Sequence, residues 1–168
     1  MDKTVLARWL RKTGASVFFL GYCPASGTVA SAFVIAVLLL VRAKTGFCNV
    51  SGGTVAYWLV TLAVIGCSFY FSSRSRELFG VEDSSRIVID EVAGQLVVFL
   101  MVPLTVRTLI AGFILFRFFD IVKPFPVYHM EELEDGVGVT MDDVAAGVLA
   151  NASLLILLAV YHAIKGYL

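Results

Sequence analysis

The sequence predicts an all-α protein, a multihelical integral membrane bundle of four to five apolar helices, some of them short or broken. Hydrophobic residues make up 59% of the 168 positions and charged residues only 15%, against about 45–50% and about 25% in average soluble proteins. Three stretches also lack any charge, over 29, 29 and 21 consecutive positions: Thr13–Val41, Thr45–Ser73 and Val144–Ile164. The length predicts a single domain, residues 1–168. A soluble helical domain with a large core is the alternative that composition leaves open.

The helices are expected in the following order. Residues 1–12 form an amphipathic segment that lies on the membrane surface. Crossing helices are expected at 28–41, 54–72, 92–103, 108–119 and 144–164. A bilayer core about 30 Å thick needs about 20 helical residues, so the second and last of these are the clearest spans. The helices at 92–103 and 108–119 are either short tilted spans or a helical hairpin packed inside the bundle, because Pro103 and Arg107 separate them.

Charge is distributed unevenly about these spans. If the chain starts in the cytoplasm, all 13 acidic residues fall on the inner side, with nine of the basic residues. The other four basic residues fall on the outer side: Arg42, Lys44, Arg107 and Lys165. The basic bias satisfies the positive-inside rule, but the acidic bias is not part of that rule. A metal or catalytic site on the inner face would explain it.

Composition and motifs exclude several functions. The 13 basic residues balance 13 acidic ones, so no basic excess is available to bind nucleic acid. The chain has no nucleophile elbow, phosphate-binding Walker loop or dinucleotide fingerprint. Cys23, Cys48 and Cys67 lack metal-ligand spacing and are expected to be small buried thiols. His129 and His162 are isolated, so we expect structural roles for both.

Two polar clusters precede apolar helices. Ser26 or Thr28 can cap the helix that follows, and Gly27 would let a ligand approach the backbone, where the N–H groups of a helix start attract phosphate. The alternative is that this segment binds no ligand and only forms a turn with a helix cap. Asp90 and Glu91 begin another apolar helix. They either complement its dipole or, being costly at a membrane boundary, bind a ligand.

Two further clusters lie later in the chain. Arg117 and Asp120 share one helical face, and Lys123 joins them if the helix continues that far. This stripe is either a structural ion-pair arrangement or a metal carboxylate between two phosphate-binding cations. Asp142 is a natural N-cap for the last helix, but Asp143 is not needed for capping. Glycines before them suggest a flexible loop.

Together the clusters offer carboxylates, two cations and helix starts at one depth of the membrane. Carboxylate oxygens in this number suit Mg²⁺, which bridges to substrate phosphate. The candidate metal ligands are Asp90, Glu91, Asp120, Asp142 and Asp143. The candidate phosphate-binding residues are Ser26, Gly27, Thr28, Arg117 and Lys123. The candidate catalytic residues are Asp90, Glu91 and Asp143.

Four segments in this order, GYCPASGT, IVIDEVAGQ, FRFFDIVKPFP and GVGVTMDDVAAG, resemble the phosphatidylglycerophosphatase A family over residues 20–150. The resemblance implies a multihelical fold, Mg²⁺ dependence, and hydrolysis of phosphatidylglycerophosphate to phosphatidylglycerol and inorganic phosphate. It implies functional roles for these matching positions: Gly27, Thr28, Asp90, Glu91, Arg117, Asp120, Lys123, Pro124, Asp142 and Asp143.

The mechanism expected from these residues is metal-assisted hydrolysis of a membrane phospholipid in the bacterial inner membrane, at a site that faces the cytoplasm. Carboxylates hold Mg²⁺, either Asp90 or Asp143 takes a proton from the attacking water, and Arg117 and Lys123 neutralise phosphoryl oxygens. Two alternatives stay open: another metal-dependent phospholipid enzyme resembling phosphatidyltransferases, and a non-enzymatic membrane protein that binds cations. The sequence predicts no oligomeric state.

Overall fold

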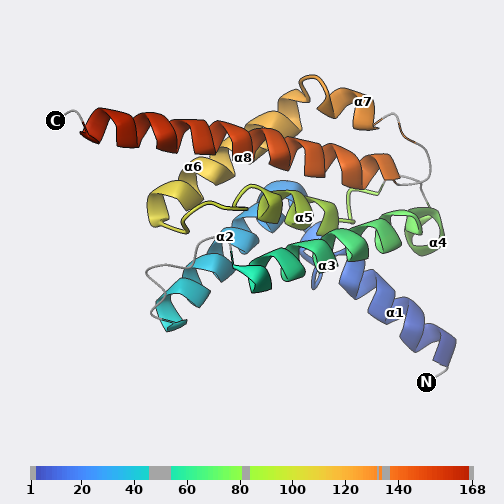
Figure 1. The fold of residues 1–168 in the computed structure, drawn as a ribbon. Coiled ribbons are helices and arrows are strands. Elements are labelled where there is room, and N and C mark those ends of the chain that lie inside the picture. The colour runs from blue at the N-terminus through green and yellow to red at the C-terminus, as the bar shows by residue number, and fades with distance from the viewer. Residues whose placement is uncertain (1–2, 46–53, 81–83, 132, 134–136, 167–168) are drawn as a thin grey trace.

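The computed structural model describes residues 3–45, 54–80, 84–131, 133 and 137–166, and these ranges hold helices and no β-strand. The elements are α1 (Lys3–Ala15), the 3₁₀ turn η1 (Leu20–Tyr22), α2 (Ser26–Thr45), α3 (Val55–Ser72), α4 (Ser75–Phe79), α5 (Ile89–Val97), α6 (Val106–Val122), α7 (Val127–Glu131) and α8 (Val137–Gly166). The short helix α5 packs against α8, α3 and α2, and Figure 1 shows it between α8 and α3.

Within the described ranges, three helices are long and apolar enough to cross a membrane: α2, α3 and α8. Only 22% to 28% of the residues in their apolar stretches are buried inside the structure. Large apolar side chains such as Leu59, Leu62 and Ile156 are therefore exposed. Cys23 and Cys67 are exposed as well, so the prediction that they are buried is wrong, and Cys48 lies outside the described residues. A soluble protein rarely exposes so much contiguous apolar surface, whereas a bilayer removes it from water. This outward-facing surface fits a membrane protein and corresponds to the predicted spans at 28–41, 54–72 and 144–164.

For the region between α3 and α8, the sequence leaves two arrangements open: short tilted spans, or a helical hairpin packed inside the bundle. A single helix over 92–103 is wrong, because α5 ends at Val97 and Met101 has a left-handed φ of 61°. Pro103 has no N–H and disfavours helical backbone at the residue before it. A capping box formed by Thr105 and Thr108 then starts α6. Because most of α5 is buried, it agrees with the alternative of a helix packed inside the bundle.

Neighbouring helices donate hydrogen bonds to carbonyl groups of α5 and of the turn after it. The Tyr57 hydroxyl on α3 donates a hydrogen bond to the Leu96 carbonyl at 2.7 Å. Asn151 Nδ2 on α8 donates to the carbonyls of Val98 and Leu100, each at 2.7 Å. A buried carbonyl without a partner is costly, so these bonds hold the short helix in place. The first turn of α5, with its two acids, is positioned in this way.

Glycines let α5 and α8 approach closely. A Cβ atom at Gly94 would lie 2.5 Å from the Asp143 carbonyl oxygen, and one at Gly147 would clash with the Gly94 carbonyl oxygen. The two helices therefore meet backbone to backbone beside Asp143. We expect Gly94→Ala to lower the free energy of unfolding by about 1–3 kcal/mol, as overpacking does elsewhere. Thermal unfolding in detergent measures this.

Gly66→Ala is the matched control, because a Cβ atom at Gly66 meets nothing within 4 Å. Both changes remove a glycine from a helix interior, which by itself stabilises a helix. The control should therefore melt at or slightly above the wild-type temperature. Equal melting temperatures for the two variants would contradict the close packing of α5 on α8.

The last helix starts earlier than predicted. Asp142 is not its N-cap, and Gly138 is not in a loop, because α8 begins at Val137 and both residues lie inside it. Hydrogen bonds to α3 support the additional turn: the Thr140 hydroxyl lies 2.8 Å from Ser68 Oγ and donates to Ser72 Oγ at 3.3 Å. Both acids of α8 therefore project from a regular helix.

The N-terminal helix α1 exposes Val5, Trp9 and Leu10. Arg11 at its C-terminal end donates to Glu77 of α4 at 3.2 Å, which places α1 near the end of α3 that leads to the acids. Its position on a membrane surface stays a prediction.

Candidate active site

The first turn of α5 carries two adjacent acids. Asp90 is only 3% exposed, and its Oδ1 accepts a hydrogen bond of 3.0 Å from the backbone N–H of Glu91. No side chain caps this helix at Val88, so the negative charges of its first turn complement the helix dipole directly. Dipole complementation alone requires neither burial nor proximity to a third acid, yet this site has both.

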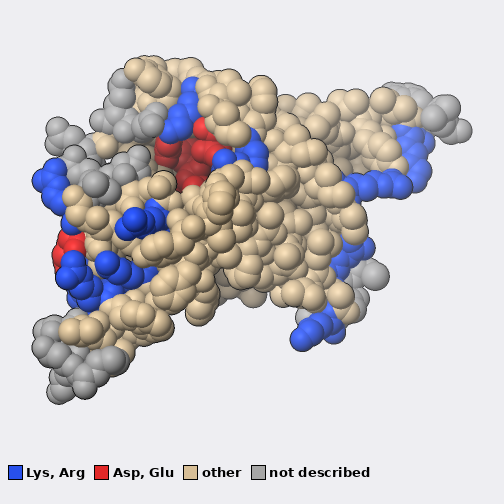
Figure 2. All heavy atoms as spheres, turned by 180° about the vertical axis from the view of Figure 1, so that it is seen from behind, with Lys and Arg blue, Asp and Glu red and all other residues tan. Residues whose placement is uncertain are grey.

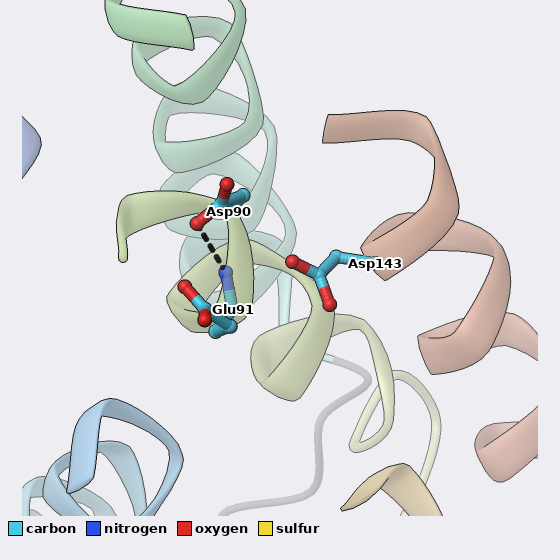
Figure 3. A group of neighbouring side chains, drawn as sticks. All are labelled: Asp90, Glu91 and Asp143. Carbon is cyan, nitrogen blue, oxygen red and sulfur yellow. Dashed lines mark hydrogen bonds between the residues drawn. The ribbon is translucent and has the colours of Figure 1, made fainter. Parts of the chain in front are cut away.

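The third acid comes from α8. Asp143 is 5% exposed, and its ligand oxygen lies within 4.8 Å of those of Asp90 and Glu91. Figure 3 shows Asp143 pointing from α8 towards the first turn of α5. The close contact at Gly94 explains this proximity, because the Asp143 backbone lies against α5. Two segments more than fifty residues apart in sequence thus form one cluster of oxygen ligands.

These carboxylates are not satisfied by the protein around them. Glu91 Oε2 and Asp143 Oδ1 are buried and have no hydrogen-bond partner among the described residues. Burial and then the neighbouring negative charge of Glu91 raise the pKa of Asp90 well above its usual value. Burial also raises the pKa of Glu91. A bound cation would supply the missing partner and favour the ionised carboxylates.

The cluster fits Mg²⁺ by its donor chemistry. It offers only carboxylate oxygens, which are the hard ligands that this ion prefers, and three such ligands leave room for water and substrate oxygens. Among the described residues, this cluster contains no His or Cys, the ligands that favour zinc.

Two cations lie at the edge of the same site. Arg117 Nη1 pairs with Asp120 Oδ2 at 2.5 Å within α6, as the predicted shared face requires. Lys123 ends α6 with a left-handed φ of 46°, and its Nζ pairs with Asp142 Oδ2 of α8 at 2.8 Å. The helix therefore does not continue to Pro124, and the turn directs Lys123 to a carboxylate on another helix. The other oxygen of Asp142 accepts the backbone N–H of Asp143 at 2.8 Å.

The start of α2 completes the arrangement. A Cβ atom at Gly27 would clash with Glu91 Oε1 and would lie 3.0 Å from Arg117 Nη1, so only glycine leaves these charged groups in place. Ser26 Oγ donates to the Ser85 carbonyl at 2.9 Å, which ties α2 to the segment before α5. Thr28 is exposed in the first turn of α2.

A cavity of about 150 Å³ lies over the acids. It is lined by Ser84, Ser85, Ile87, Asp90, Glu91, Asp120, Lys123, Val139, Asp142 and Asp143. In Figure 2 the carboxylates form one red patch flanked by blue cations. With Arg117 beside it, the cavity brings together five carboxylates and two cations, an excess of negative charge that a metal ion would balance.

The structure thus gathers the predicted site residues at one end of the bundle. Asp90, Glu91 and Asp143 form the compact cluster, whereas Asp120 and Asp142 line the cavity while paired to cations. The predicted phosphate-binding residues divide similarly: Lys123 lines the cavity, Gly27 and Arg117 border Glu91, and Ser26 and Thr28 do not line the cavity.

Sequence reasoning missed Ser84 and Ser85, which line the cavity ahead of α5. Their position five and six residues before Asp90, in the segment that leads into α5, was the available signal. It also missed the packing role of Gly94 and Gly147, although both lie in the quoted motifs.

Comparison with known proteins decides the family. The family model for phosphatidylglycerophosphatase A matches residues 13–158. The chain belongs to the phosphatidylglycerophosphatase A family. This confirms the resemblance based on the four motifs, all of which lie within the matched region. No solved structure matches the chain.

Three curated relatives give further context. The chain is 43% identical over 89 residues to a phosphatidylglycerophosphatase A of Haemophilus influenzae, covering 52% of this chain and 53% of that protein. It is 31% identical over 100 residues to the Escherichia coli protein of the same name, covering 58% of each. It is also 43% identical over 100 residues to a putative phosphatidylinositol-3-phosphatase of Bacteroides thetaiotaomicron, covering 56% of this chain and 63% of that protein. The chain therefore spans between about half and two thirds of the relatives' length.

Proposed function

We propose that this protein removes the terminal phosphate of phosphatidylglycerophosphate, giving phosphatidylglycerol and inorganic phosphate, with Mg²⁺ as cofactor. The carrying observation is that acids from α5 and α8 converge within 4.8 Å in a small cavity bordered by Lys123 and Arg117. Membership of the phosphatidylglycerophosphatase A family and the relatives of that name support the choice of substrate. The reaction would serve phospholipid biosynthesis.

The residues of the cluster would divide the work as follows. Asp90, Glu91 and Asp143 would hold Mg²⁺, since two of their buried oxygens lack a hydrogen-bond partner in the described part of the chain. When bound, the ion supplies Lewis acidity that draws negative charge from the phosphoryl oxygens and makes the attacking water more acidic. Asp120 and Asp142 also line the cavity and stay candidates for metal binding.

The chain's own groups would handle the protons and the phosphate charge. Water attacks phosphorus and the ester bond to the glycerol oxygen breaks, so one proton leaves the water and one reaches the glycerol oxygen. Asp90 or Asp143 would accept the first proton, being buried beside the reacting centre. Arg117 and Lys123 would neutralise the phosphoryl oxygens, and Gly27 would leave room for them beside Glu91.

One relative suggests a second substrate. The name of the Bacteroides thetaiotaomicron protein specifies a phosphatidylinositol-3-phosphatase. Both lipids carry a phosphomonoester on a polar headgroup, so the same cluster of acids would suit either. They differ in the size of the group next to the phosphate, glycerol in one and inositol in the other. We favour the smaller headgroup, because the cavity has only about 150 Å³.

The test is phosphate release by the purified protein from the two lipids presented in matched detergent micelles. We expect kcat/KM for phosphatidylglycerophosphate to exceed that for phosphatidylinositol-3-phosphate by at least about tenfold, the effect of one well-made contact. Phosphatidic acid, with no headgroup beyond the phosphate, is the control for recognition of glycerol. A preference for the inositol lipid would replace the proposed substrate, and release from none of them would reject the function.

We further propose that the acids face the cytoplasm, in the bacterial inner membrane. With α2, α3 and α8 as spans, the site lies at the start of α2, after the end of α3 and near the start of α8, so all of its elements reach the same side. The four basic residues predicted on the outer side then lie at the opposite ends of α2, α6 and α8: Arg42, Lys44, Arg107 and Lys165. The substrate's acyl chains would stay in the bilayer while its phosphate enters the cavity.

Cysteine labelling tests this topology. In a variant with Cys23, Cys48 and Cys67 replaced by serine, Glu77→Cys should react with a membrane-impermeant reagent only after the cells are opened. Lys165→Cys should react in intact cells. Both positions are exposed in the structure, and the two variants control for each other. Labelling of Glu77→Cys in intact cells, or equal labelling of both, would contradict the topology.

A further inference from the structure

A second cavity, of about 570 Å³, lies at the end of the bundle opposite the acids. We propose that it binds an anionic phospholipid through its phosphate, from the leaflet opposite the candidate active site. The proposal rests on the three membrane spans and not on the phosphatase activity. The cavity is formed by the end of α2, the start of α6 and the last turns of α8.

The cavity is far from the acids although the same helices build both. On α2, Arg42 follows Gly27 by fifteen residues, about 22 Å along a helix. On α8, Tyr161 follows Asp143 by eighteen residues, or about 27 Å. That separation is close to the thickness of a bilayer's apolar core. A lipid in this cavity would thus lie in the other leaflet and would not compete with the substrate.

The described residues that line this cavity include two arginines and no Asp or Glu. Arg42 and Arg107 both line the cavity. The sequence has no Asp or Glu in 3–76, 92–119 or 144–168, ranges that include the lining helices and the loop after α2. Arg107 is in the first turn of α6 and Arg42 in the last turn of α2, so the helix dipoles at this cavity differ in sign and the two arginine side chains carry the positive charge. Two arginines with no carboxylate to pair with are suited to a phosphate, which each can contact through two N–H groups.

The rest of the lining distinguishes a phospholipid from free phosphate. Ala111, Leu154, Leu157 and Leu158 form an apolar wall beside the arginines. Tyr161 completes the rim, with a ring that suits the membrane interface. Charge at one end and hydrocarbon contact alongside it are the two parts of a lipid, and free phosphate would use only the first. Arginines that merely extend to the bilayer surface would need no such hollow.

The experiment measures lipid binding by native mass spectrometry of the full chain in detergent, with dioctanoyl phosphatidylserine as the probe. Dioctanoyl phosphatidylcholine tests the need for net negative charge, and inorganic phosphate tests for a free-ion site. We expect the anionic lipid to bind at least about tenfold more tightly than either, and Arg42→Gln with Arg107→Gln to remove that advantage, the effect of losing charged hydrogen bonds.

Lys44→Gln with Lys165→Gln is the matched control, because these exposed residues lie at the same end but do not line the cavity. It should leave lipid binding unchanged. Leu157→Trp, which fills the hollow from a half-exposed position while keeping both arginines, should also abolish tight binding. If the double arginine variant does not fold, Leu157→Trp still tests whether the cavity binds the lipid. Equal loss in the lysine control, unchanged binding in Leu157→Trp, or equal binding of inorganic phosphate would each overturn the proposal.

Discussion

Replacing Asp143 by asparagine is expected to reduce phosphate release from phosphatidylglycerophosphate by at least about 10²-fold, as for other groups that stabilise transition-state charge. Asparagine has the same shape but lacks the negative charge that would hold Mg²⁺. Asp143 is buried, its ligand oxygen lies within 4.8 Å of those of Asp90 and Glu91, and its Oδ1 has no hydrogen-bond partner among the described residues. Steady-state phosphate release at saturating Mg²⁺ measures the loss.

Stability should change in the opposite direction. In the absence of metal, the carboxylates of buried Asp90 and Asp143 and half-buried Glu91 repel one another, so neutralising one relieves that repulsion. We therefore expect Asp143→Asn to unfold in EDTA at the wild-type temperature or above it. Glu77→Gln is the matched control: it neutralises an exposed acid of α4 paired with Arg11 and should keep the full rate. A variant at Asp143 that melts early but keeps the wild-type rate per folded molecule would make this acid structural.

The second large effect is expected at the cations. Arg117→Lys should lose about 10²-fold in rate, because lysine cannot copy the planar fork that holds two phosphate oxygens. Arg117 is paired with Asp120 through Nη1, while its Nε is buried without a hydrogen-bond partner among the described residues. Lys123→Ala should lose a little less in rate than Arg117→Lys, but by a similar order of magnitude. Both rates are measured per molecule of folded protein.

A structural role predicts a different pattern. Lys123 pairs with Asp142 at 2.8 Å, so its loss would then lower stability more than the rate. Arg11→Lys is the control for the arginine change, because Arg11 also pairs with a carboxylate, Glu77, but outside the cavity. It should leave the rate unchanged. Cation variants that melt early yet turn over normally would move the proposed phosphate site to residues 26–28 alone.

Much of this arrangement follows from the sequence because the motifs lie at helix ends. Apolar stretches fix the three long helices, and acids cannot enter them cheaply, so polar clusters collect at their boundaries. Spacing also predicts the Arg117–Asp120 pair, since residues three apart share a helix face. Because successive spans cross the membrane in opposite directions, the segments that carry Gly27, Glu91 and Asp143 are expected on the same side, and the structure brings these three residues together.

Tertiary contacts decide what the sequence could not predict. In the sequence Asp142 resembles an N-cap. In the structure α8 begins more than a turn before Asp142, at Val137, and hydrogen bonds between Thr140 and α3 support that first turn. Lys123 looks like a partner of its own helix, but the left-handed turn directs it to Asp142. The approach of α5 to α8 depends on what faces Gly94, which only the folded structure reveals.

Metal dependence of the site is tested most directly by phosphate release from phosphatidylglycerophosphate by the purified full chain, first with Mg²⁺ and then after its removal with EDTA. We expect turnover with Mg²⁺, loss of at least about 10²-fold in EDTA, and recovery when Mg²⁺ is added back. Asp143→Asn, measured in parallel, should show little response to Mg²⁺. Equal turnover with and without the metal would contradict the claim that Asp90, Glu91 and Asp143 form a metal-dependent phosphatase site.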